Sequence, residues 1–419
     1  MGYLELLRGN ANFRNLWLGD LVSLLGDWFN LIATATLVAT LTGSGVAVGG
    51  LLAIRMLSVF FASPFAGVAA DRFDRKTILI VSDLLRAVVV LGFLLVQEPG
   101  DVWLLYVLTC IQMALSGFFF PARRAILPDV VEPAELGTAN ALSSATWSVM
   151  LAIGAGLGGV VAGTWGLAPA FLIDAATFLV SVAFLTRVKP RPTPVAAGSG
   201  AGMRGALRQY VDGLKYLVRA KDILAIAMHK PCNALFVAGG FGVIQVVLTR
   251  EVFVYGKEGS LGLGLLYACV GIGTGFGPLI ARRFTGDRHR PMRVVLGLAY
   301  LASALGLLTV GLADVFWVVL LGGAIRGFGG GTGWVFSTQL MLVLVPNHVR
   351  GRVFSTEFAT MTLFSAAGSF GVGVLLDSTS LGVQGTLFLL AGLALIPAAL
   401  WTVWIRVGTP ASPPRDTRR

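Results

Sequence analysis

The segment from Gly67 to Leu79, GVAADRFDRKTIL, places five charged residues between two long apolar stretches. Charges this dense are too costly in hydrocarbon, so the segment marks a short loop in water and fixes the ends of the flanking stretches. The whole chain is 56% hydrophobic and 13% charged over 419 residues, whereas soluble domains carry roughly 25% charged residues. This composition predicts a membrane protein with many spans and excludes an ordinary soluble enzyme.

Twelve apolar stretches reach the length of about 20 residues that a helix needs to cross the hydrocarbon core. Backbone hydrogen bonds must close within each segment in lipid, so all twelve are predicted to be helices. They start near residues 16, 45, 77, 102, 140, 168, 223, 260, 292, 314, 354 and 383. The sequence therefore predicts an all-α membrane protein with 12 transmembrane helices, the first of them a retained helix and not a signal peptide.

The basic residues lie mostly in alternate loops. With the N-terminus inside the cell, the proposed outer loops carry only Arg250 and Lys257 as basic residues. This asymmetry favours the cytoplasmic membrane, with both termini in the cytoplasm. The net charge of +11 follows from this topology, and we expect no nucleic-acid partner.

Residues 187–222 separate the sixth and seventh spans. They begin with a linker rich in Pro, Gly and Ser. Leu207, Leu214 and Leu217 then recur at helical spacing among basic residues, which predicts an amphipathic helix on the inner membrane surface. The predicted organisation is a six-helix bundle over 1–186, this cytoplasmic linker over 187–222, a second six-helix bundle over 223–406, and a tail over 407–419.

The charged loop resembles the signature that joins the second and third helices of major facilitator superfamily transporters. Asp74 stands where the family pattern has a Gly, and a degenerate second copy runs from Gly277 to Arg290. The resemblance implies the major facilitator fold, with two six-helix halves that alternate access to a central site. It also implies a cytoplasmic latch made of Gly67, Asp71, Arg72, Arg75, Lys76 and Glu357.

The fifth span contains GAGLGGVVAG, which is similar to the antiporter motif of the same superfamily. Gly154, Gly158 and Gly163 match the motif, and Gly159 replaces its Pro. The resemblance implies export and a seam of close helix contact through small residues. Ordinary small-residue packing is the alternative.

Two further segments resemble one branch of the superfamily, the exporters that include macrolide efflux and enterobactin exporter proteins. These segments are FFFPARRAILPDVVEPAELGTANAL and LVPNHVRGRVFS. The drug/proton antiporter type carries an Arg in span four, where this chain has Gln112 and apolar neighbours. Arg326 in span ten is the candidate to take over its role in proton handling.

The first span carries a polar face. Asp20, Ser23, Asp27, Asn30 and Thr34 fall within about 80° on a helical wheel. An ionisable residue within a span indicates function by default, and Asp27 lies close to the predicted bilayer midplane. We therefore predict Asp27 as the proton or cation site, with a structural ion pair to Arg55 as the alternative. Asp20, nearer the cytoplasmic end, is predicted to act in structure or gating.

Other ionisable residues have simpler interpretations. Asp83 and Arg86 are three residues apart, which predicts a local ion pair. Lys230 is expected to extend to the inner surface. Asp174 either lines an outer vestibule or bonds to neighbouring helices.

By the resemblance, spans one, four, seven and ten line the substrate cavity. Few charges and many apolar side chains favour an amphiphilic or lipophilic substrate over a sugar or phosphate. The polar and aromatic candidates are Asp27, Asn30, Gln112, Asn233, Phe236, Gln245 and Trp334.

These observations predict a secondary active transporter that exports lipophilic or amphiphilic compounds by proton-coupled alternating access. A lysophospholipid or siderophore transporter, and a receptor or scaffold that does not transport, are the alternatives. The sequence holds no catalytic triad, nucleotide loop or metal-spaced His cluster, so we expect no enzyme activity, cofactor or metal. The expected partners are the substrate, protons and membrane lipids, and we expect a monomer.

Overall fold

The computed structural model describes residues 2–191 and 203–407. Contacts divide the chain into a first unit, Met1–Gly205 with Gln245–Ala268, and a second unit, Ala206–Ile244 with Cys269–Arg419. Residues 192–202 of the predicted linker (187–222) and residues 408–419 of the predicted tail (407–419) lie outside the described residues, and the predicted domain boundaries stay predictions.

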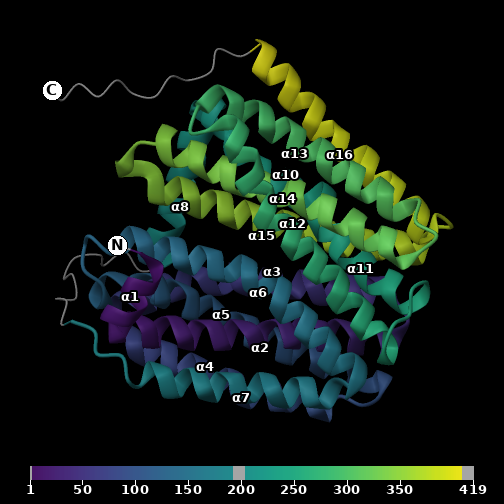
Figure 1. Cartoon of the computed structure of the whole chain (residues 1–419), viewed down its shortest axis with the longest axis horizontal. Coiled ribbons are helices and arrows are strands. Elements are labelled where there is room, and N and C mark those ends of the chain that lie inside the picture. The colour runs from purple at the N-terminus through teal and green to yellow at the C-terminus, as the bar shows by residue number, and fades with distance from the viewer. Residues whose placement is uncertain (1, 192–202, 408–419) are drawn as a thin grey trace. The chain divides into compact units, whose positions relative to one another are not determined.

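The first unit is a bundle of long helices that lie side by side (Figure 1). Helix α2 packs against α6 and α7, α3 packs against α5, and α4 lies between α5 and α7. The helices of this unit are α1 (Tyr3–Gly9), α2 (Ala11–Thr42), α3 (Gly45–Arg72), α4 (Arg75–Gly92), α5 (Val102–Val130), α6 (Leu136–Thr164) and α7 (Leu167–Leu185). Two short 3₁₀ turns, Phe93–Leu95 and Pro99–Asp101, join α4 to α5.

Polar side chains set the ends of these helices. The Asn10 side chain accepts a hydrogen bond from the Phe13 backbone N–H at the start of α2, and Gly43, at φ 60°, ends that helix in the left-handed conformation. Asp74 accepts from the Thr77 backbone N–H at 2.8 Å and caps α4. The residue that departs from the family signature therefore fixes where the third span begins.

The second unit holds most of the remaining helices. Helix α13 packs between α14 and α16, where the Trp401 indole donates to the Arg293 carbonyl at 2.7 Å. The helices are α8 (Met203–Arg219), α9 (Lys221–Ala227), α10 (His229–Asn233), α11 (Gly239–Glu251), α12 (Ser260–Thr285), α13 (His289–Gly311), α14 (Phe316–Leu344), α15 (Asn347–Ser378) and α16 (Gly382–Val407). A π-helical turn, Ala234–Ala238, joins α10 to α11, and the ends of α11 and α12 that meet around residue 255 belong to the first unit.

Within the described residues, twelve helical stretches correspond to the twelve predicted spans. Eleven helical stretches are long and apolar enough by composition alone. Helix α14 is the twelfth, with 29 residues, and its seven glycines and Arg326 lower its mean hydropathy. The predicted fold is confirmed. Helix α15 begins at Asn347, seven residues before its predicted start, because the polar segment NHVRGR continues the helix beyond the apolar stretch.

The amphipathic helix predicted after the linker forms as α8. Leu217 is buried in a core cluster with Ile223 and Val353, and a Cβ at Gly213 would meet the Arg352 carbonyl oxygen at 2.6 Å. Helix α8 therefore packs tightly against α15. Leu214 remains exposed, and the placement of α8 on a membrane surface stays a prediction.

Candidate functional site

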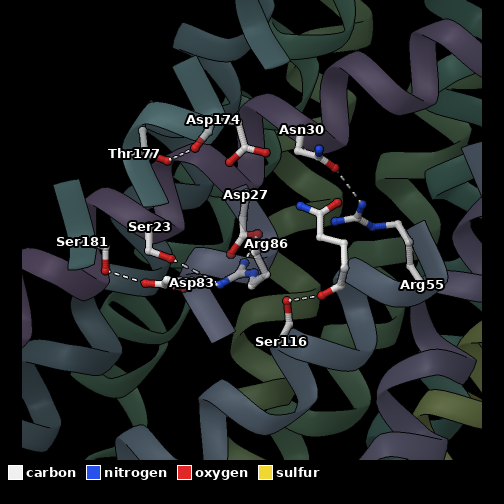
Figure 2. Close-up of polar contacts among 11 residues, drawn as sticks. Ser23, Asp27, Asn30, Arg55, Asp83, Arg86, Ser116, Asp174, Thr177 and Ser181 are labelled. Carbon is white, nitrogen blue, oxygen red and sulfur yellow. Dashed lines mark hydrogen bonds and ion pairs between the residues drawn. The ribbon is translucent and has the colours of Figure 1, made fainter. Parts of the chain in front are cut away.

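The predicted polar face of α2 points into the first unit (Figure 2). Asn30 and Thr34 are fully buried and Asp20 and Ser23 nearly so, and Thr34 donates its hydroxyl proton to the Asn30 carbonyl at 2.7 Å. An otherwise apolar helix carries such a stripe only where other polar groups meet it. The prediction that this face lies inside the bundle is confirmed.

Arg86 of α4 is the centre of a group that we call the charge cluster. Its side chain is 1% exposed and pairs with Asp27 of α2 and, at 3.1 Å, with Asp83 one turn earlier. The Ser181 hydroxyl of α7 donates to Asp83 at 2.6 Å, and the guanidinium lies 4.1 Å from the centre of the Phe178 ring. The charge cluster comprises Ser23, Asp27, Asn30, Arg55, Asp83, Arg86, Asp174 and Ser181 (Figure 2).

The ion pair between Asp27 and Arg55, which was the alternative interpretation of Asp27, is not formed, and Asp27 pairs with Arg86 instead. The Arg55 side chain is buried and donates to the Asn30 amide oxygen at 3.5 Å. The predicted local pair of Asp83 and Arg86 is confirmed. Sequence spacing could show only that local pair. The guanidinium group of Arg86 also bonds to Asp27 on another helix, and spacing along one helix does not reveal such a contact.

Asp174 is the second fully buried acid of the charge cluster, after Asp83. It lies on α7, where the Thr177 hydroxyl donates to its backbone carbonyl at 2.7 Å. Opposite it on α2 is Gly26, where an added Cβ would overlap the side chains of Asp174 and Thr177. The first span therefore approaches the buried acid closely only because residue 26 has no side chain.

Replacing Gly26 with alanine is expected to destabilise the protein by about 1–3 kcal/mol, the usual cost of forcing extra atoms into a packed core. Thermal unfolding of the purified protein measures the change. Gly67→Ala is the matched control, since a Cβ at Gly67 meets nothing within 4 Å. Equal melting temperatures for the two variants would contradict the packing of α2 against α7.

The other coupling candidates have partners of their own. Asp20 pairs with Arg123 of α5 at 2.6 Å in the first unit. Arg326 lies in the second unit, where its guanidinium is 5.4 Å from the centre of the Phe241 ring. The sequence did not predict Arg123 as the partner of Asp20. The one available signal was that Arg123 lies in the exporter-like segment PARRA.

The charged loop is tied to its own unit. Arg75 pairs with Asp129 at the end of α5 at 2.7 Å and donates to the Ala125 carbonyl at 3.0 Å. Lys76 donates to the Thr186 carbonyl at 2.8 Å. Arg72 is exposed, and the side chain of Asp71 lies outside the described part. The role of these residues as a latch stays a prediction.

Glu357, the remaining latch candidate, pairs with Lys230 in the second unit. The ammonium and carboxylate are 3.0 Å apart, with side chains 7% and 3% exposed. The Lys230 ammonium also lies 4.7 Å from the centre of the Trp334 ring. The prediction that Lys230 extends to the surface was wrong, because Glu357 and an aromatic face supply the interactions that allow the charge to stay buried.

The glycines of the predicted antiporter motif form a close seam along α6. A Cβ at Gly154 would meet Trp28 of α2 at 2.9 Å, and one at Gly158 would meet the Phe29 backbone at 3.1 Å. On the next face, a Cβ at Gly159 would lie 2.6 Å from the Gly264 Cα, and one at Gly163 would lie 2.8 Å from the Leu261 Cβ. The described contacts fit close helix packing. A role in antiport stays a prediction.

The cavity candidates fall into two groups. Asn30, Gln112 and Gln245 are buried in the first unit, and neither amide atom of Gln112 has a hydrogen-bond partner. Asn233 and Phe236 are half-buried and Trp334 is 49% exposed in the second unit. Their gathering around one cavity stays a prediction. Within the described residues no group of His, Cys, Asp or Glu is placed to hold a metal ion.

Comparisons with known proteins agree with this architecture. The sequence profile of the Major Facilitator Superfamily matches residues 16–277. The MFS-type transporter YfiS of Bacillus subtilis is 29% identical over 95% of this chain and 94% of its own. The putative bacilysin exporter BacE of Bacillus amyloliquefaciens is 26% identical over 87% and 88% of the two chains. The multidrug efflux pump Tap of Mycobacterium bovis is 25% identical over 70% and 84%.

Solved structures show the same fold. A mutant of the nucleoside transporter NupG superposes with a TM-score of 0.76 and covers 93% of this chain and 99% of its own, at 11% identity. At that identity the likeness is one of fold alone. The relatives are named as transporters or exporters, which agrees with the expectation of a protein that is not an enzyme.

Proposed function

The chain belongs to the Major Facilitator Superfamily, and we propose that it exports lipophilic or amphiphilic compounds across the cytoplasmic membrane, driven by inward movement of protons. Two of its relatives are named an exporter and a multidrug efflux pump. The substrate, the coupling ion and the orientation in the membrane are part of this proposal.

The pair of Asp27 and Arg86 is the observation that carries the proposal. The Asp27 side chain is 17% exposed, whereas Arg86 is 1% exposed and also bound to Asp83. Asp27 is thus the more accessible partner of the pair, and Arg86 has a second carboxylate, Asp83, that holds it in place. Protonation removes one of the two negative charges that hold Arg86, which changes the balance between conformations of the first unit.

The uncharged amides support an amphiphilic substrate. Gln112 and Gln245 are buried in the first unit, and the amide nitrogens of both have no hydrogen-bond partner in the part of the chain that the structure describes. Buried amides without partners carry a free-energy cost that a ligand with a polar group relieves. A substrate with a few polar groups on an apolar body suits both these amides and the apolar spans.

The basic loops support the proposed orientation. Arg75, Lys76 and Arg123 lie on the side that the positive-inside pattern assigns to the cytoplasm. With that orientation a proton entering the cell moves down the membrane potential. Each charge then supplies roughly 2.3 kcal/mol per 100 mV to the export of the substrate.

Replacing Asp27 with asparagine is expected to reduce dye export to the level of cells treated with an uncoupler. Asparagine keeps the size of the side chain but neither binds a proton nor pairs ionically with Arg86. The measurement is efflux of ethidium from energised bacterial cells that express wild type or Asp27→Asn, with and without the uncoupler.

Asp314→Asn, which changes an exposed acid beyond the end of α13, is the control and should export like wild type. Efflux that survives Asp27→Asn in full would exclude Asp27 as the coupling group. Wild type that exports no lipophilic dye, although present in the membrane, would contradict multidrug export and favour the lysophospholipid alternative.

A further inference from the structure

We propose that Asp174 is a second proton-binding group, which holds a proton in the conformation described here. The use of this proton rests on the proposed function, since a second titratable acid would let one transport cycle carry a further proton. The physical basis of the proposal is independent of that function and lies in how Asp174 is buried.

Among the described residues, Asp174 differs from the other acids of the first unit's interior in forming no ion pair. Asp20 pairs with Arg123, and Asp27 and Asp83 both pair with Arg86. Asp174 is fully buried, and no described residue donates a hydrogen bond of ordinary geometry to either of its carboxylate oxygens. A buried carboxylate without a countercharge is so costly that the group takes up a proton instead.

The helices packed against α7, which are α2, α4 and α6, supply no unpaired positive charge to Asp174, and Arg55 of α3 reaches it only through the neutral Asn30 amide. Helix α2 presents Asp27 and the Asn30 amide, and the Asn30 side chain faces the Asp174 carboxyl (Figure 2). Helix α4 presents Arg86, which already serves two acids, and α6 has no ionisable residue. With Asp27, Asp83 and Asp174 all ionised, the charge cluster would hold three negative charges against the two positive charges of Arg55 and Arg86.

Asn30 links Asp174 to the second arginine. Its amide oxygen accepts from Arg55 at 3.5 Å, while its amide nitrogen has no hydrogen-bond partner among the described groups. Loss of the proton from Asp174 would create an anion that attracts Arg55 of α3 toward α7. Asp27 lies near the same carboxyl, so negative charges on both acids would repel each other.

Infrared spectroscopy of the purified full-length protein in lipid nanodiscs tests the assignment without any substrate. Wild type at neutral pH should show the deuterium-sensitive C=O stretching band of a protonated carboxylic acid, and Asp174→Asn should lose that band. Asp83→Asn is the matched control, because Asp83 is equally buried but paired with Arg86 and Ser181, and the band should persist in it. Asp174→Glu, which keeps a carboxyl, should retain the band at a shifted frequency and replaces the Asn variant if that variant does not fold.

A band unchanged in Asp174→Asn, no band in wild type, or a band lost only in Asp83→Asn would each overturn the proposal. Ethidium efflux driven by a pH gradient in proteoliposomes then tests the use of the proton, and Asp174→Asn should lose stimulation by the gradient. Failure of wild type to move ethidium contradicts the proposed function and leaves the infrared assignment intact, so the two failures are distinguishable.

Discussion

Replacing Arg86 with methionine is expected to lower the free energy of unfolding by about 3–5 kcal/mol, the usual cost of removing one partner from a buried ion pair. Methionine fills a similar volume but leaves Asp83, which is fully buried, with only the Ser181 hydroxyl. It also removes the partner of Asp27. Thermal unfolding of the purified protein should show a large fall in melting temperature, and cells that express the variant should export no dye.

Arg86→Lys, measured in the same experiment, distinguishes the effect of the positive charge from the effect of the guanidinium shape. Lysine keeps a positive charge but lacks the planar fork that binds two carboxylates at once. The variant should therefore recover part of the lost stability and little of the transport. A melting temperature for Arg86→Met equal to that of wild type would show that Asp83 and Asp27 do not depend on Arg86.

Hydropathy was enough to predict the twelve helices because lipid allows few other structures. The starts of the helices followed from the same signal, except where polar residues continue a helix, as Asn347 does at the start of α15. The inward polar face of α2 could also be predicted, since the helical period places Asp27 and Asn30 on one side.

The partners of the charged residues could not be predicted in the same way. Asp83 and Arg86 are one turn apart on a single helix, so their pairing is visible in the sequence. Asp27 and Arg86 are 59 residues apart and meet only because α2 and α4 both pack against α7. From the sequence, Arg55 was the partner suggested for Asp27, and only the packing shows that Arg86 pairs with it instead.

The prediction that the Lys230 side chain extends to the membrane surface was wrong for a related reason. A lysine near the end of a span usually extends to the interface, and nothing in the sequence near Lys230 opposes this. Its partner Glu357 comes from α15, 127 residues later in the chain, and the Trp334 face comes from α14. The sequence shows each group, but only the packed second unit shows that together they hold a buried ammonium.

Replacing Lys230 with methionine is the second change expected to have a large effect, again about 3–5 kcal/mol of unfolding free energy. The substitution leaves the Glu357 carboxylate buried, with a side chain that is 3% exposed, and no other salt bridge to Glu357 is found within the described residues. The melting temperature of the purified variant measures the effect.

A double substitution, Lys230→Met with Glu357→Gln, removes both charges. It distinguishes the net contribution of the ion pair to the free energy of unfolding from the penalty of leaving one buried charge without its partner. A buried ion pair often contributes little beyond what uncharged residues of similar size would, because both ions lose their hydration. The double variant should therefore be more stable than Lys230→Met alone and approach wild type. If the double variant is less stable than Lys230→Met, the unpaired Glu357 carboxylate does not explain the stability lost in Lys230→Met. The lost contact between the Lys230 ammonium and the Trp334 ring would then explain it.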